Sequence, residues 1–282
     1  MLNTPIKKNI FVKSCRIKDW IHILGLPLLG IIYASRYSLF THKSLLALII
    51  SSLYLAHGYS LNNYFDLKYN IFIPQRGARK ILFFSYFLLF INCIISYFYS
   101  LSIFLLLIIG DIAGLIYSAP PLRFKKNIFL NLFLNSFGFS LLFLIGFISA
   151  NQAITISSII MTSFFGLHFV PLQLIHQISH LEEDRNQHIP TFYNKHGAKI
   201  TIFLFKITFI CIAFWTLLIP ISKSRSIYLF FITILLFIVL NYALRNIKTD
   251  NVFNIKGAVK IRLFFRKAYI LYGLIVSIII YS

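Results

Sequence analysis

The chain has 282 residues, of which 59% are hydrophobic and only 12% are charged, whereas an average soluble domain has roughly 45–50% and about 25%. Because so few polar side chains cannot cover a water-exposed exterior, the composition excludes a soluble globule and a disordered chain. The net charge of +20 would suggest a nucleic-acid partner in a soluble protein. Here the basic residues cluster between apolar runs, which is typical of membrane loops and excludes a nucleic-acid-binding fold.

Residues 1–19 carry five basic side chains without a continuous apolar run, which predicts a cytoplasmic N-terminal arm. After this arm, nine apolar runs approach the length of about 20 residues that a helix needs to cross a bilayer. Their expected bounds are 20–35, 44–63, 80–99, 101–118, 128–150, 154–175, 199–221, 226–245 and 266–281. The sequence therefore predicts an all-α integral membrane bundle of about nine transmembrane helices, with one membrane domain formed by residues 20–281.

The basic residues also predict the orientation of the bundle. With nine spans, 22 Lys and Arg side chains fall on the side of the N-terminus and four fall on the opposite side. Since loops rich in Lys and Arg stay in the cytoplasm, we expect a cytoplasmic N-terminus. The expected location is the cell (inner) membrane, which the chain crosses several times.

The acidic residues are concentrated in two short segments. Only seven Asp and Glu exist, and four of them lie in residues 62–70 (NNYFDLKYN) and 176–184 (HQISHLEED). These segments follow the second and sixth spans on the cytoplasmic side, and each places polar residues at offsets of three and four: 63, 66 and 70, then 177, 180 and 184. Such offsets keep side chains on one face of a helix, so we expect two polar stripes that face each other.

The chemistry of the stripes suggests a ligand. Carboxylate and amide oxygens suit Mg²⁺, which usually joins one or two protein carboxylates to substrate phosphates. Basic residues on the same side of the membrane can neutralise phosphate oxygens. A phosphorylated lipid would satisfy both features.

Three segments in this order resemble the UbiA superfamily of intramembrane prenyltransferases. Residues 62–70 resemble the family's Asn-Asp-x-x-Asp-x-x-x-Asp signature on the second helix, and residues 74–76 (PQR) resemble the Pro-x-Arg that follows it. Residues 117–125 (YSAPPLRFK) are similar to the Tyr-Ser-x-Pro-Pro-x-Arg segment after the fourth helix. Residues 180–197 resemble the end of the second Asp-rich signature, with its downstream Thr and Gly.

The chain departs from both signatures at defined positions. Where the family has aspartates, it has Asn63, Asn70, Gln177 and His180. Asp66 and Asp184 keep their carboxylates, and Glu183 stands beside the second. These substitutions predict a metal site with less negative charge and a greater dependence on basic residues.

The resemblance implies an enzyme that transfers an isoprenoid chain from an allylic prenyl diphosphate to an aromatic or other lipophilic acceptor, with Mg²⁺ as cofactor. The expected metal-binding residues are Asn62, Asn63, Asp66, Asn70, His180, Glu183 and Asp184. The expected diphosphate-binding residues are Arg76, Arg123, Lys125 and Lys195. The expected catalytic residues are Asp66, Asp184 and Tyr117, of which Tyr117 would face the reacting centre.

Several alternatives remain open at the level of sequence. The same site could belong to an intramembrane terpene cyclase, or to a non-catalytic protein that binds or transports isoprenoid lipids. His176, His180 and Asp184 share a spacing that could bind Zn²⁺. Asp111, inside the fourth span, could orient the acceptor or form a structural salt bridge. The acceptor, the prenyl length and the oligomeric state are not specified by the sequence.

Overall fold

The computed structural model describes residues 10–35, 41–67, 75–150, 153–181, 184, 190–245, 248–249, 252–253 and 255–281. The long helices are α3 (Gly25–Ser35), α4 (His42–Leu67), α5 (Gln75–Tyr99), α6 (Leu101–Ser118), α7 (Ile128–Ser149), α8 (Ile156–Ser179), α10 (Phe192–Thr216), α11 (Lys223–Arg245) and α12 (Ile255–Tyr281). The short elements are α1 (Ile10–Ser14), α2 (Ile17–Trp20), the 3₁₀ helices η1 (Ile21–Leu24) and η2 (Phe124–Lys126), and the strands β1 (Lys248–Thr249) and β2 (Val252–Phe253).

Nine segments of the described residues are long and apolar enough to cross a membrane, which confirms the predicted all-α membrane bundle. The predicted and observed bounds of the spans differ most where the end of a span carries charged residues. The first span begins at Ile10 rather than 20, so it includes part of the expected N-terminal arm. The seventh span begins at Phe192 rather than 199, and the ninth begins at Gly257 rather than 266. Both helices begin before basic residues, such as Lys195 and Arg262, that interrupt the apolar run and so make the predicted span too short.

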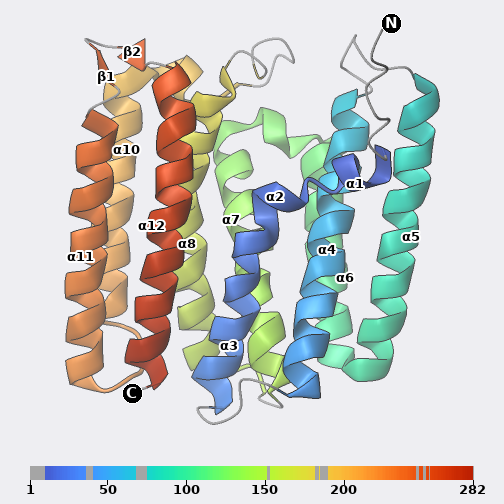
Figure 1. Ribbon diagram of the computed structural model, residues 1–282, viewed down its shortest axis with the longest axis horizontal. Coiled ribbons are helices and arrows are strands. Elements are labelled where there is room, and N and C mark those ends of the chain that lie inside the picture. Colours follow the sequence, from blue (N-terminus) through green and yellow to red (C-terminus); the bar gives the residue numbers. More distant parts are fainter. Residues whose placement is uncertain are drawn as a thin grey trace, which may run out of the picture.

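The helices form a closed ring of neighbours in which the first and last spans meet, and Figure 1 shows α3 between α12 and α4. Helix α3 packs against α7 and α4, α7 packs against α8, and α8 packs against α10 and α12. Helix α12 returns to contact α3, which closes the ring. The strands β1 and β2 pair as a two-residue antiparallel link between α11 and α12.

The contact between α3 and α7 depends on two glycines. A Cβ atom added to Gly146 would lie 1.8 Å from the carbonyl oxygen of Pro27, and one added to Gly30 would lie 2.1 Å from that of Phe143. Small residues let membrane helices approach until their backbones touch, and dispersion contacts then stabilise the pair. Any side chain at these two positions would force the helices apart.

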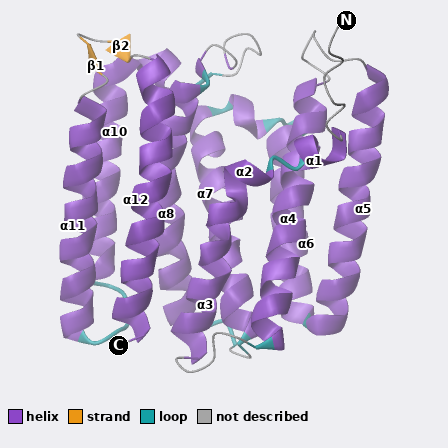
Figure 2. Cartoon of the chain, in the orientation of Figure 1, coloured by secondary structure: helices purple, strands orange, loops and turns teal. Residues whose placement is uncertain are grey.

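One end of the bundle carries both sequence segments, and we call it the motif end. Helices α1 and α2, η2 and the β1–β2 link lie at this end, whereas the C-terminal end of α12 lies at the opposite end (Figure 2). Residues 10–19 of the expected N-terminal arm are helical and packed on the bundle, with Ser14 and Cys15 buried. The motif end is therefore partly covered by the N-terminal segment.

Candidate active site

The two polar stripes meet at the motif end around a small polar pocket of about 80 Å³. Helix α4 contributes Asn62 and Asp66 to its wall, and the segment from α8 to residue 184 contributes His180 and Asp184. The remaining lining residues are Arg16, Tyr117, Lys125, Asn131, Gln173, His176 and Gln177. Two segments more than a hundred residues apart thus supply one site.

Asp66 is the centre of a network of charged and polar side chains. Its Oδ1 atom forms an ion pair with the ammonium of Lys125, and Arg123 Nη2 lies 3.7 Å from the same oxygen. Asn62 Nδ2 donates to Asp66 Oδ2 at 3.0 Å, while Asn62 Oδ1 accepts from Ser118 Oγ at 3.1 Å and from Lys125 Nζ at 3.3 Å. The first stripe is therefore held by the segment that follows α6.

The fold of that segment explains how Lys125 reaches the pocket. Arg123 has a positive φ of 40°, which turns the chain into η2. Asn131 Nδ2 then donates to the carbonyl oxygen of Lys125 at 3.0 Å. Only 3% of the Lys125 side chain is exposed. Burial lowers the pKa of the Lys125 ammonium, and the adjacent Asp66 carboxylate acts in the opposite direction by favouring the charged form.

The second stripe makes different contacts. Gln177 Oε1 accepts a hydrogen bond of 3.1 Å from the backbone nitrogen of Phe192. Arg262 Nη1, from α12, contacts His180 Nε2 and lies 3.4 Å from His176 Nδ1. Because the Arg262 guanidinium already contacts a ring nitrogen of each imidazole, this arrangement opposes a zinc ion there. Among the described residues, no group of three His, Cys, Asp or Glu side chains is arranged to hold a metal.

The structure brings most of the predicted site residues together. Asn62, Asp66, Tyr117, Lys125, His180 and Asp184 line the polar pocket, and Arg123 joins them through Asp66. Two predicted residues lie elsewhere: the amide of Asn63 is turned toward the carbonyl oxygen of Ser14, and Lys195 is exposed on α10. Asn70, Glu183 and the side chain of Arg76 lie outside the described residues.

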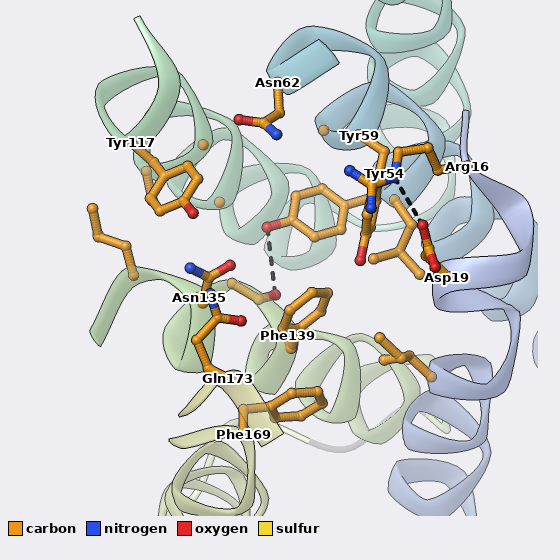
Figure 3. A pocket seen from close by; sticks show the side chains of 18 of the residues that line it. Arg16, Asp19, Tyr54, Tyr59, Asn62, Tyr117, Asn135, Phe139, Phe169 and Gln173 are labelled. Carbon is orange, nitrogen blue, oxygen red and sulfur yellow. Dashed lines mark hydrogen bonds and ion pairs between the residues drawn. The ribbon is translucent and has the colours of Figure 1, made fainter. Parts of the chain in front are cut away.

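A second and larger cavity, of about 230 Å³, adjoins the polar pocket. Five residues line both spaces: Arg16, Asn62, Tyr117, Gln173 and His176. Aromatic side chains from α4, α6, α7 and α8 surround it, including Tyr54, Tyr59, Tyr117, Phe139 and Phe169 (Figure 3). The polar compartment thus shares part of its wall with a larger one, which is lined by aromatic and other apolar side chains and also by charged ones such as Asp19, Arg262 and Arg266.

Glycines give the large cavity its width. A Cβ atom added to Gly58 or Gly114, both in its wall, would meet no atom within 4 Å. At Gly110 a Cβ atom would lie 2.8 Å from the hydroxyl of Tyr54, so this glycine makes room for the ring. Asp111, also in the wall, has its Oδ1 atom 3.8 Å from Nε2 of His57. The structure therefore gives Asp111 a basic neighbour on α4.

Some lining residues follow a sequence pattern that lies outside the family motifs. Gln173 lies four residues before Gln177 and therefore on the same helix face, and Asn131 lies four before Asn135 in an otherwise apolar span. Gln173 Nε2 donates to Asn131 Oδ1 at 3.3 Å, which joins α8 to α7 beside the pocket. Arg16 and Arg262 had no such signal, because neither belongs to a motif.

The donor set of the polar pocket fits a magnesium ion held mainly by substrate. Asp66 and Asp184 supply carboxylates to one small space, and Asn62 supplies an amide oxygen. Mg²⁺ commonly uses one or two protein carboxylates and takes its other ligands from substrate phosphates and water. Lys125, Arg123 and Arg16 provide positive charge around the same space.

The sequence matches the model of the UbiA prenyltransferase family over residues 23–265, which is most of the chain. The chain belongs to this family. No curated protein matches its sequence. As a UbiA family member, the protein is of a prenyltransferase type, and its nine spans are those of a multi-pass membrane protein.

Solved structures share the fold of this UbiA family member at low sequence identity. A UbiA homologue from Archaeoglobus fulgidus bound to DMAPP and Mg²⁺ has a TM-score of 0.74 at 14% identity, covering 95% of this chain and 99% of that chain. A digeranylgeranylglyceryl phosphate synthase has a TM-score of 0.69 at 18% identity, covering 95% and 98%. The apo UbiA homologue from Aeropyrum pernix K1 has a TM-score of 0.68 at 15% identity, covering 93% and 99%.

Proposed function

We propose that the protein transfers an isoprenoid chain from an allylic prenyl diphosphate to a lipophilic acceptor. The observation that carries this proposal is the junction of the two compartments: a polar pocket with carboxylates and buried cations shares five lining residues with a larger cavity that contains aromatic side chains. A prenyl diphosphate has the same two parts. The Archaeoglobus fulgidus homologue binds DMAPP or GPP with Mg²⁺, which supports this choice of donor.

In this proposal, the diphosphate binds in the polar pocket. Lys125 lies at its wall with an ammonium group whose present partners are Asp66 and Asn62, and Arg123 lies behind the same carboxylate. Arg16, the N-cap residue of α2, also lines the pocket. Charge-assisted hydrogen bonds from these cations would hold phosphate oxygens more strongly than neutral donors.

Asp66 and Asp184 hold Mg²⁺ in this proposal, with the amide oxygen of Asn62 as a further ligand. The bound ion supplies Lewis-acid stabilisation of the leaving diphosphate. Lys125, Arg123 and Arg16 neutralise the charge that develops on the leaving oxygens as the allylic C–O bond breaks. Because the two signatures have lost carboxylates that could bind metal ions, neutralisation of the leaving diphosphate depends more on these cations.

In this proposal the large cavity takes up the allylic chain. Tyr117 lines both compartments, so its ring lies where the first carbons of the chain would emerge from the diphosphate site. Aromatic faces stabilise nearby positive charge, and a site closed to water prevents hydrolysis of a reactive intermediate. The acceptor would reach this junction from the bilayer, and the charge asymmetry of the loops supports a junction near the cytoplasmic face.

Mass spectrometry of lipids from cells with and without the protein tests this function. We expect a lipid whose mass is increased by a whole number of isoprene units and which disappears with Asp66→Ala or Asp184→Ala. An unchanged lipid profile would favour a binding or transport protein. A new hydrocarbon that contains no acceptor atoms would instead favour a terpene cyclase.

A further inference from the structure

Residues Ile10–Trp20 form a strap across the motif end, fixed to two different helices. On the α4 side, Ser14 Oγ lies 3.1 Å from Ser60 Oγ, and Ser60 Oγ lies 3.7 Å from the sulfur of Cys15. On the α12 side, Arg266 Nη2 donates to Asp19 Oδ1 at 3.0 Å. The strap therefore joins α4 to α12, and its residues Arg16 and Asp19 line the large cavity.

Asn63 makes a further side-chain hydrogen bond from α4 to the strap. Its Nδ2 atom donates to the carbonyl oxygen of Ser14 at 2.7 Å. A carbonyl oxygen only accepts hydrogen bonds, so the NH₂ group of Asn63 must face it. An ionised aspartate has no donor and would place a carboxylate against that oxygen. Position 63 is one of the signature positions at which this chain carries Asn in place of Asp.

The strap carries Arg16, which lines both the polar pocket and the large cavity. Arg16 stands at the turn between α1 and α2 with a positive φ of 48°. Its Nε atom contacts Asp19 Oδ2 at 2.8 Å, and its guanidinium lies 5.6 Å from the centre of the Tyr59 ring. Since Arg16 lies two residues after Ser14, its position depends on where Ser14 is held.

We propose that Asn63 is a positioning residue rather than a metal ligand: it fastens the strap so that Arg16 reaches the diphosphate pocket. The identity of the anion rests on the proposed function, whereas the fastening rests on the contacts of the strap alone. This role explains why an amide at position 63 is compatible with an active site. The amide supplies a donor that the aspartate of the family signature lacks.

Cysteine labelling tests the fastening without any activity assay. Cys15 is buried in the strap, so in a Cys93→Ser, Cys211→Ser background its reaction with a maleimide reports release of the strap. We expect Asn63→Asp to increase the labelling rate at least several-fold. The matched control Asn241→Asp, a half-buried position on α11, should leave it unchanged. Equal labelling of the parent and Asn63→Asp would overturn the proposal.

A second variant covers the case in which Asn63→Asp fails to fold. Ser60 is fully buried and contacts both Ser14 and Cys15, but it belongs to neither signature. We expect Ser60→Ala to accelerate Cys15 labelling as well. An unchanged labelling rate in Ser60→Ala would show that these contacts do not hold the strap and would count against the proposal.

Binding of inorganic diphosphate, measured with and without Mg²⁺, tests the link to Arg16. We expect Asn63→Asp and Arg16→Ala each to weaken binding about 10-fold or more, the effect of losing one charge-assisted hydrogen bond. The double variant should bind no more weakly than Arg16→Ala, because both changes remove the same contact. Tighter Mg²⁺-dependent binding in Asn63→Asp would identify position 63 as a metal ligand and overturn the proposal. If the parent itself fails to bind diphosphate, the proposed function fails, while the labelling result still decides the fastening.

Discussion

Filling the large cavity with one side chain should weaken binding of the prenyl chain and leave binding of its headgroup intact. Gly114 offers the site for this test, because it lies in the cavity wall and a Cβ atom there would meet nothing within 4 Å. Gly114→Leu adds four carbon atoms to a space of about 230 Å³. The helix itself should tolerate leucine, which is a better helix former than glycine.

The size of the effect follows from the apolar surface that the substrate can no longer bury. If the leucine displaces two to four substrate carbons, at about 0.8 kcal/mol per buried methylene, the cost is about 1.6–3.2 kcal/mol, or roughly 15- to 200-fold in affinity. Inorganic diphosphate has no chain, so its affinity should not change. The difference between the two ligands separates a filled cavity from a damaged headgroup site.

The assay is titration calorimetry of purified protein in nanodiscs, with geranyl diphosphate and inorganic diphosphate as ligands. Gly273→Leu is the matched control, because Gly273 lies in a span, also has open space around it and does not line the cavity. The reasoning is refuted if Gly114→Leu and Gly273→Leu bind geranyl diphosphate equally well.

Four further predictions follow from the same structure. Lys125→Met should weaken inorganic diphosphate binding roughly 10- to 150-fold in calorimetry, the range for losing one charged hydrogen bond, whereas Lys195→Met, at an exposed position, should change it little. Asp66→Ala and Asp184→Ala should each lower diphosphate release about 10²- to 10³-fold while the protein remains folded. Gly146→Ala should lower the melting temperature in detergent, because overpacking costs about 1–3 kcal/mol, and Gly25→Ala, with nothing near its Cβ position, should not. A reporter fused after Lys126 should be cytoplasmic and one fused after Ser282 external, and a cytoplasmic C-terminus would show that the number of spans or their orientation is wrong.

The sequence predicts the bundle and the meeting of its two motifs for a simple reason. Hydropathy defines each span, and an even number of spans between two segments returns the chain to the same side of the membrane. Asp66 and Asp184 are separated by four spans, so counting predicts that they lie on the same side of the membrane, and the structure places both in one pocket. Helical spacing predicts a stripe of residues 63, 66 and 70, but only Asp66 of these lines the pocket, where Asn62 accompanies it, whereas Asn63 turns toward Ser14. In the second stripe, residues 177, 180 and 184 all line the pocket, as their spacing predicts.

Contacts between distant helices had no such basis in the sequence. The side chain of Asn63 points toward Ser14 because of the path that the N-terminal strap takes across the bundle. The sequence of the strap shows that it is basic, but it does not predict this path. Arg262 reaches His176 and His180 because α12 packs against α8, a pairing that no local pattern encodes. The late start predicted for the ninth span has a related cause: basic residues at the start of α12 mark the end of an apolar run, but they do not end a helix.

The most direct test of catalysis is simultaneous measurement of diphosphate release and acceptor prenylation by purified protein in nanodiscs. The reaction would contain geranyl diphosphate, Mg²⁺ and a lipid extract from the host as the source of acceptor. The proposed function predicts release that depends on the extract, with one prenylated lipid formed for each diphosphate released and neither product formed by Asp66→Ala. Tight binding without release, or release at the same rate without the extract, would contradict prenyl transfer.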